Sequence, residues 1–167
     1  MDLPAALYVP AGEGYLATAL TIGPWDPGFQ HAGPPAALLA REAERVSAVE
    51  GGQTVRLAYD ILGPVPVGPV RVRADVMRPG RRVELVEAVL EAGDRPLMRL
   101  SAWRMRIRAE EVPADPAPAA MPAPPEASRP EDAEFFTEDV AYHRALEWRF
   151  AAGWTASALW RSRRPGR

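Results

Sequence analysis

The feature that most constrains this fold is a change of hydrophobic period close to residue 52. Residues 34–50 are rich in helix formers and place their apolar side chains on one face at helical spacing. Residues 54–107 then alternate apolar and polar side chains with a period of two, which predicts antiparallel strands with one wet face. One helix is therefore expected beside several long strands.

The helix has clear start and stop signals. Pro34 and Pro35 stand where a helix tolerates proline, because the first amides of a helix lack partners. Gly51 is the expected terminator. The apolar face consists mostly of small side chains, so another element can approach this helix closely. The residues expected on that face are Ala36, Leu39, Ala40, Ala43 and Val46.

Five strands are expected around this helix. Their predicted ranges are Tyr15 to Ile22, Thr54 to Leu62, Val70 to Arg78, Arg82 to Ala92 and Pro96 to Ile107. The last two should form a hairpin with its turn at Gly93-Asp94. Strands of this kind extend about 33 Å, and the helix about 24 Å. The sequence therefore predicts an α+β hotdog fold, in which a long curved antiparallel sheet wraps around one central helix.

Both strands of the hairpin change their apolar face midway. In the first strand, Val83 and Leu85 give way to Val86, Ala88 and Leu90. In the second strand, Met98 and Leu100 give way to Trp103, Met105 and Ile107. A β-bulge explains such a switch. A sheet that is covered on both faces, by the helix and by a partner, explains it equally well.

Composition and charge exclude several classes of protein. The net charge is −2, and all 20 basic residues are arginine. Acidic residues are mixed with them along the chain, which argues against a nucleic-acid-binding surface. No apolar run approaches the roughly 20 residues that cross a bilayer, and no signal peptide is visible, so a cytoplasmic protein is expected. The absence of cysteine excludes disulfides, and two histidines, His31 and His143, make a zinc site improbable.

The chain is expected to divide at a segment rich in alanine and proline. Residues 113–130 contain almost no large apolar side chain, so they cannot bury enough surface to form a core. They are interpreted as an exposed, semi-rigid linker. Residues 1–112 then form the hotdog domain, and residues 131–167 form a separate C-terminal part.

Three segments of the first domain resemble a known family. The segments WDPGFQHAGPPAALLARE, YDILGPVPVGPVRVRADVMRPGRRVELVEAVLEAG and RPLMRLSAW resemble the N-terminal hotdog of thioesterase-like proteins related to acyl-CoA thioesterase II. The resemblance covers nearly all of residues 10–108. Its most specific parts are H-x-G-P-P at 31–35 and R-P-G-R-R at 78–82. The resemblance implies hydrolysis of acyl-CoA thioesters without a further cofactor, and a homo-oligomer in which hotdog units pair around the ligand.

The C-terminal part resembles the beginning of the second hotdog in that family. The segments RALEWRFAAGW and SALWRSRRP are similar to its first two strands, which places remnant strands between Ala141 and Arg161. Residues 131–167 are therefore predicted to be an incomplete second hotdog. In acyl-CoA thioesterase II the catalytic aspartate and its threonine and glutamine partners lie in the second hotdog, and no position here matches them. In related single-domain thioesterases the central helix carries an acid, and the matching position here is Ala40, with Glu42 as a poor substitute.

The candidate site is the N-terminus of the predicted helix. Free amides there can stabilise an oxyanion, and the candidates are those around Ala32 and Gly33. His31 is a candidate for orienting water or the thioester, or it caps the loop. Trp25 and Phe29 are candidates for lining an acyl or pantetheine channel, or they pack the loop onto the sheet. The arginines Arg78, Arg81 and Arg82 are candidates for binding the phosphates of coenzyme A, or they are simply solvated.

Two alternative functions stay open. Asp26 and His31 have the D-x4-H spacing of hotdog (R)-specific enoyl-CoA hydratases, in which such a pair transfers the proton of hydration. The asparagine that normally lies between these two residues is missing. The other alternative is a non-catalytic half that binds acyl chains or pairs with another subunit.

Overall fold

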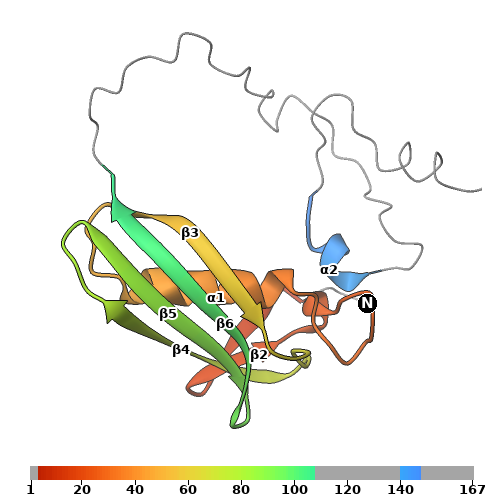
Figure 1. The fold of residues 1–167 in the computed structure, drawn as a ribbon. Helices are drawn as coiled ribbons and strands as arrows, with labels where there is room; N and C mark the ends of the chain where they lie inside the picture. The colour runs from red at the N-terminus through yellow and green to blue at the C-terminus, as the bar shows by residue number, and fades with distance from the viewer. Residues whose placement is uncertain (1–3, 108–139, 148–167) are drawn as a thin grey trace, which may run out of the picture. The chain divides into compact units, whose positions relative to one another are not determined.

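The computed structural model describes residues 4–107 and 140–147 of the 167-residue chain. The chain divides into two units, residues 1–109 and 110–167, close to the predicted boundary at residue 112. The first unit contains one curved antiparallel sheet and one long helix, which confirms the predicted hotdog class (Figure 1). The predicted linker at 113–130 lies outside the described residues.

Six strands form the sheet, in the order β1-β2-β4-β5-β6-β3, and each adjacent pair is antiparallel. The strands are β1 (Tyr8–Ala11), β2 (Gly14–Ala17), β3 (Gly52–Ile61), β4 (Pro69–Arg78), β5 (Val83–Ala92) and β6 (Arg95–Arg106). The helix α1 (Gly33–Val46) lies across one side of the sheet (Figure 1). We call that side the helix face and the opposite side the outer face.

The start of α1 agrees with the sequence prediction, and its end does not. Pro34 and Pro35 occupy the first turn and are buried. The helix ends at Val46 rather than near Gly51, because Ser47 is already extended. The side chain of Glu84, on β5, accepts a hydrogen bond from the Ala48 amide at 3.4 Å and fixes the chain after the helix. Gly51 instead has a φ of 63° and supplies the turn into β3.

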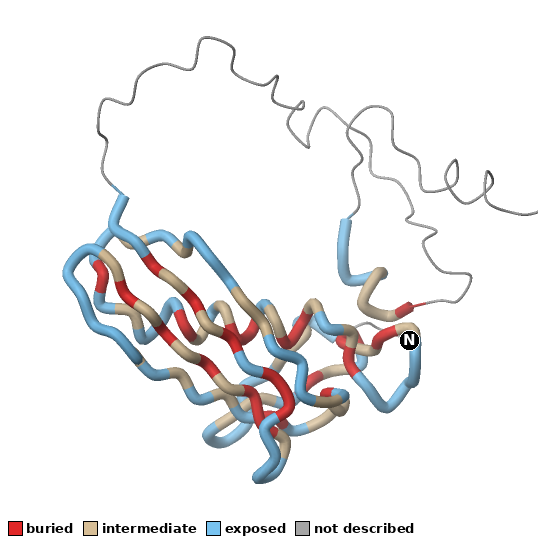
Figure 2. Tube along the Cα trace, viewed as in Figure 1, coloured by how far each residue is buried: buried red, intermediate tan, exposed pale blue. Residues whose placement is uncertain are grey.

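The core lies between α1 and the middle strands of the sheet. Leu38, Leu39 and Ala43 are buried on the helix, whereas Val46, which was predicted on the buried face, is 40% exposed. Along β5, buried and half-buried residues alternate, as the period of two requires (Figure 2). The buried residues that pack from β5 and β6 are Val86, Ala88, Leu90, Met98, Leu100 and Ala102.

The N-terminal part of the sheet differs from the prediction. The sequence predicted one strand from Tyr15 to Ile22, but β2 ends at Ala17 and a 3-10 turn follows at Ala19–Thr21. The hydroxyl of Thr21 donates to the Thr18 carbonyl oxygen at 2.8 Å and stabilises this turn. The additional edge strand, β1, was missed because its four residues carry too little alternation to predict a strand.

The other strands agree with their predicted ranges to within two residues. Gly93 and Asp94 form the two-residue turn between β5 and β6, with Gly93 at a φ of 60°. In the second unit, α2 (Ala141–Arg144) is a single helical turn at the place where the predicted strands begin. Alanine and arginine favour a helix, which explains this difference. The rest of the predicted strands, from residue 148 on, lies outside the described residues.

Residues 4–107 and 140–147 contain neither a membrane-spanning helix nor a candidate metal cluster. None of the helices formed by these residues has the length and apolarity to cross a membrane. They contain no cluster of three or more histidine, cysteine or acidic residues that could hold a metal ion.

Glu91 should make the stability of the fold dependent on pH. Its carboxylate is 8% exposed and binds Arg73 at 2.6 Å and Arg71 at 3.1 Å. The hydrogen bond from Arg73 is the main cause that lowers the pKa of Glu91 below its ordinary value. A carboxylate whose pKa is lower in the folded protein than in the unfolded chain stabilises the fold at pH values above its pKa in the unfolded chain. This stabilisation is lost as the pH falls through its pKa in the folded protein.

We therefore expect Glu91→Gln to reduce the free energy of unfolding at pH 7 by about 1 kcal/mol, since both arginines are half exposed. Urea unfolding at pH 7 and at acidic pH measures the effect. The free energies of unfolding of the wild type and the variant should become equal at acidic pH. Glu87→Gln is the matched control, because that carboxylate is 33% exposed and 3.6 Å from Arg99. An equal loss in both variants would contradict a special role for Glu91.

Candidate functional site

The loop before α1 is fixed by hydrogen bonds to two other segments. The Gln30 amide donates to the Val65 carbonyl at 2.8 Å, and the His31 amide donates to the Thr21 carbonyl at 2.7 Å. The chain passes so close to Gly23 that a Cβ atom there would lie 2.9 Å from the His31 nitrogen. The start of the helix is therefore held by contacts on both sides of the loop.

Gln30 is a buried residue that the sequence interpretation missed. Its Nε2 donates to the Pro66 carbonyl at 2.7 Å, and its Oε1 accepts from the Tyr8 hydroxyl at 2.5 Å. The side chain thus joins the loop to β1 and to the segment before β4. A polar residue in a loop gives no sequence signal for such a role, because its partners are distant along the chain.

His31 forms a local hydrogen bond in the loop just before α1. Its Nδ1 accepts a hydrogen bond from the Gly33 amide at 3.0 Å. An accepting Nδ1 carries no proton, so the neutral ring has its proton on Nε2. This hydrogen bond is of the kind that the loop-capping alternative describes, and the imidazole uses one of the two amides proposed for an oxyanion.

The Ala32 amide is the remaining donor at this end of α1. Pro34 and Pro35 have no amide hydrogen, and Gly33 donates to His31. Ala32 is exposed, and its N–H forms no hydrogen bond with another of the described residues. It lies at the positive end of the helix dipole, so it can donate to a developing negative charge.

The loop residues Trp25, Asp26 and Phe29 do not form a closed channel with the described residues. Trp25 is 86% exposed and Phe29 is 37% exposed. The carboxylate of Asp26 accepts a hydrogen bond from the Gly28 amide at 2.7 Å, which stabilises a turn of its own loop. The packing of Trp25 onto the sheet, one of the two interpretations from the sequence, is not what the structure shows.

Glu42 lies far from His31 along the helix. Glu42 is eleven positions after His31, which corresponds to about 16 Å at 1.5 Å per residue. The Glu42 carboxylate accepts from the Tyr15 hydroxyl at 2.6 Å, and this hydrogen bond is the main cause that raises the pKa of Tyr15. Ala40 is half buried and has no ionisable group. The structure thus does not bring an acid from α1 to His31.

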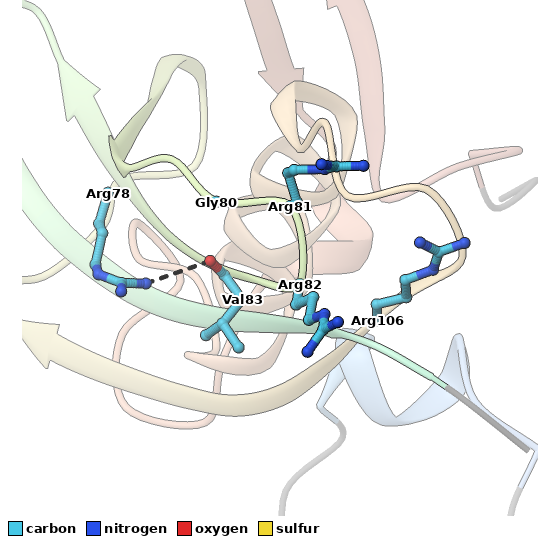
Figure 3. Close-up of a pocket in the computed structure, with 6 residues that line it drawn as sticks. All are labelled: Arg78, Gly80, Arg81, Arg82, Val83 and Arg106. Atoms are coloured by element: carbon cyan, nitrogen blue, oxygen red, sulfur yellow. Dashed lines mark hydrogen bonds between the residues drawn. The ribbon is translucent and has the colours of Figure 1, made fainter. Parts of the chain in front are cut away.

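Three predicted arginines line one pocket at the end of the domain away from the N-terminus of α1. A solvent-open pocket of about 560 Å³ lies beside the turn between β4 and β5 (Figure 3). Its lining residues are Arg78, Gly80, Arg81, Arg82, Val83 and Arg106. Arg78 donates to the Val83 carbonyl at 3.3 Å. No acidic residue among those described forms an ion pair with the four arginines, so the pocket is strongly cationic.

Arg106 was not predicted as part of this cluster. Its amide donates to the Arg82 carbonyl at 2.8 Å, which brings the end of β6 beside the turn. The two residues are far apart in the sequence, so only the pairing of β5 with β6 places them together.

The arginine pocket and the N-terminus of α1 lie at opposite ends of the helix. The chain just after α1 is bound to Glu84, which follows the pocket residue Val83. The 14 residues of α1 span about 21 Å. A single ligand that touched both places on one chain would have to run the whole length of the helix.

An apolar strip on β3 flanks the first turns of α1. Tyr59 donates a hydrogen bond to the Ala36 carbonyl at 3.0 Å, and burial raises the pKa of this tyrosine. The helix face of β3 is only partly covered by α1, so Leu57 is 43% exposed and Ile61 is 63% exposed. Leu62, directly after the strand, is 51% exposed. This strip is another feature that the sequence interpretation did not assign to the site.

The fold and this arrangement define a hotdog domain of the thioesterase-like superfamily. The chain belongs to the family of the acyl-CoA thioesterase N-terminal domain, whose family model matches residues 21–105. No curated protein matches the chain.

Two solved structures are similar to it in fold. One is a protein assigned as thioesterase II from Thermobifida fusca YX, at 19% identity and a TM-score of 0.67, with 95% of this chain and 57% of that chain covered. The other is a conserved hotdog protein from Alicyclobacillus acidocaldarius, at 15% identity and a TM-score of 0.59. The match covers 82% of this chain and 50% of that chain. The chain thus spans about half the length of these two relatives.

The capping role of His31 can be measured directly. A single local hydrogen bond contributes about 1 kcal/mol, so His31→Ala should lower the free energy of unfolding by about that amount. Asparagine can accept the same amide hydrogen bond, so His31→Asn should regain most of the loss. Urea unfolding of the three proteins tests this. Equal stability of His31→Ala and the wild type would show that the Gly33 hydrogen bond contributes nothing to stability.

Proposed function

We propose that this chain is the acyl-CoA-binding part of a thioesterase, which presents the thioester to an attacking water. The observation that carries the proposal is the Ala32 amide at the positive end of α1, which donates to none of the described residues and belongs to an exposed residue. It lies within a domain of the acyl-CoA thioesterase family. A thioester carbonyl that points at this amide would be polarised by the amide hydrogen and by the helix dipole.

The reaction follows from this placement. The oxygen of water bonds to the carbonyl carbon, and the carbonyl oxygen becomes an oxyanion that accepts the Ala32 N–H. A base takes one proton from the attacking water and returns it to the sulfur as the carbon–sulfur bond breaks. Coenzyme A thus leaves as a thiol, and the acyl group leaves as a carboxylic acid. Among the described residues, the acids nearest in sequence are occupied by structural hydrogen bonds: Asp26 within its loop and Glu42 with Tyr15. The base that activates the water is therefore assigned to another hotdog unit.

The arginine pocket is suited to the phosphates of coenzyme A. Arg78, Arg81, Arg82 and Arg106 supply guanidinium groups, which bind phosphate through paired hydrogen bonds. Because the pocket is at the other end of α1 from Ala32, we propose that one substrate contacts the N-terminus of α1 on one unit and the pocket on a second unit. This arrangement supports a paired assembly, with the apolar strip of Leu57, Ile61 and Leu62 facing the partner or the acyl chain.

A purely binding role is the second candidate. It is favoured by the hydrogen bond between His31 and Gly33, which commits the one histidine of the helix entrance to capping. The hydratase alternative has less support, since the Asp26 carboxylate is bound to its own loop. Trp25 and Phe29 stay candidates for contact with the acyl or pantetheine part, and their exposure leaves them accessible to a ligand.

Thiol release from saturated acyl-CoAs of different lengths distinguishes these functions. The chain contains no cysteine, so a thiol reagent reports only on coenzyme A that is released. We expect tight binding of acyl-CoA by the isolated chain without release well above background, because its base is supplied by another unit. Release well above background would show that this chain has its own base. Addition of water to an enoyl-CoA without thiol release would support the hydratase alternative instead.

The arginine pocket can be tested by calorimetry with coenzyme A. The double variant Arg81→Gln/Arg106→Gln should bind coenzyme A about tenfold more weakly than the wild type, with a smaller dependence on salt. Arg41→Gln is the matched control, since Arg41 is 57% exposed and lies on α1. An unchanged affinity in the double variant would remove the pocket from the proposed site.

A further inference from the structure

The residues that lead into α1 form a small ladder outside the six-stranded sheet. Residues 28–31 are flanked by residues 21–23 on one side and by residues 65–67 on the other, with one isolated β-bridge on each side. Two backbone hydrogen bonds of between 2.7 and 3.1 Å hold each side together. We call these three segments the entrance ladder. The amides that donate within it are those of Gly23, Gln30, His31 and Val67.

The entrance ladder determines the direction of the Ala32 amide. Ala32 directly follows His31, whose own amide is bound to the Thr21 carbonyl at 2.7 Å. The Ala32 N–H lies in the same peptide plane as the His31 carbonyl, so its direction depends on where residues 28–31 are held. The four hydrogen bonds of the ladder fix its segments relative to one another, but none of them involves β1.

Gln30 joins the entrance ladder to the edge of the sheet. Its side chain is buried, and its Oε1 accepts a hydrogen bond from the hydroxyl of Tyr8, the first residue of the edge strand β1. Its Nε2 donates to the Pro66 carbonyl at 2.7 Å. One amide group therefore binds a segment of the ladder with one atom and the sheet with the other.

The orientation of the Gln30 amide group follows from its partners. The Pro66 carbonyl can only accept, so Nε2 faces it and Oε1 faces the Tyr8 hydroxyl. Water has little access to Gln30, which is 8% exposed, and a buried polar group that loses its partner is costly. Loss of the Tyr8 hydroxyl therefore loosens the attachment of the ladder to β1.

The hairpin of β1 and β2 carries a second tyrosine with a different target. The rings of Tyr8 and Tyr15 meet edge to face, with their centroids 6.4 Å apart. The Tyr15 hydroxyl donates to Glu42, in the second half of α1, at 2.6 Å. The hairpin thus has one hydroxyl bound to the entrance ladder and one bound to the helix, at similar distances. Only the first of these hydrogen bonds acts on the ladder directly.

We propose that Gln30 is a positioning residue for the thioester. Through Tyr8 and Pro66 it holds the entrance ladder so that the Ala32 amide points to the thioester carbonyl. This role rests on the proposed function, because it concerns the donor that polarises that carbonyl. A preorganised donor stabilises developing negative charge without having to reorient, and a small displacement of the donor weakens this effect.

Two variants remove the contacts of Gln30 to different degrees. Tyr8→Phe removes only the hydroxyl and keeps the ring against Tyr15, so this variant should fold. Gln30→Met keeps the length of the side chain and removes both hydrogen bonds. Tyr15→Phe is the matched control, because it removes a hydroxyl of the same hairpin that is bound to Glu42 instead. Circular dichroism confirms that each variant is folded.

The Ala32 amide can be observed without a ligand. In proton–nitrogen NMR spectra of the full chain, the Ala32 signal should shift in Tyr8→Phe and in Gln30→Met, and it should stay in place in Tyr15→Phe. Both active variants remove the same hydrogen bond, so the double variant should shift the signal no further than Gln30→Met alone. An Ala32 signal that is unmoved in both folded single variants would overturn the positioning role.

Octanoyl-CoA labelled with carbon-13 at its carbonyl reports on the bound thioester. In the wild type, its infrared carbonyl stretch should lie at a lower frequency than in water, since the Ala32 amide and the helix dipole polarise it. In Tyr8→Phe the frequency should move back toward the value in water, and the affinity for octanoyl-CoA should fall about fivefold. The affinity for coenzyme A itself should stay the same, because the arginine pocket lies at the other end of α1. Tyr15→Phe should behave as the wild type does.

The outcomes distinguish the positioning role from the proposed function. A wild-type carbonyl frequency equal to that in water would contradict the polarising role of Ala32, and both proposals with it. A lowered frequency that is the same in the wild type, Tyr8→Phe and Gln30→Met would overturn the role of Gln30 alone. An equal loss of affinity for octanoyl-CoA and for coenzyme A would also overturn it, because such a loss indicates a general structural effect.

Discussion

The burial of one face of α1 against the curved sheet is the contact on which the rest of the structure depends. Leu39 is completely buried, and the small side chain of Ala43 lets the strands approach the helix closely. Because the sheet wraps around this helix, both ends of α1 come to lie against loops and strand ends rather than in open solvent. One end gives an exposed amide and the other adjoins a cationic pocket. The proposed chemistry thus follows from the position of a single helix.

Polar side chains fix that helix at both ends. At the N-terminus, His31 binds the Gly33 amide, and the buried Gln30 joins the loop to distant segments. At the C-terminus, Glu84 binds the Ala48 amide, and Arg104 donates to the Gly52 carbonyl at 2.7 Å. These charged groups occupy the helix face at one end of the sheet. The apolar side chains of the same strand segments, such as Leu85 and Trp103, consequently point to the outer face.

The candidate site was predicted from the sequence only in part. The H-x-G-P-P motif indicated the correct helix start, because two prolines have a restricted backbone whatever surrounds them. The role of Arg78, Arg81 and Arg82 in binding phosphate stays a prediction, although all three line one pocket. Arg106, Gln30 and the apolar strip around Ile61 were not, since each gains its role from a residue far away in the chain. The roles proposed for His31, Trp25 and Phe29 stay predictions about a ligand.

The sequence by itself determined the number of long strands, the helix start and the hotdog class, because hydrophobic period and proline chemistry act locally. It also showed that the apolar face changes along the hairpin, but not why. Only the tertiary structure decided this point, since the cause is the buried Glu84 and Arg104 on the helix face and not a bulge in β5 or β6. The tertiary structure also separated the cationic pocket from the Ala32 amide by the length of α1. Such distances depend on which strands pair and where the helix lies, and no local pattern contains that information.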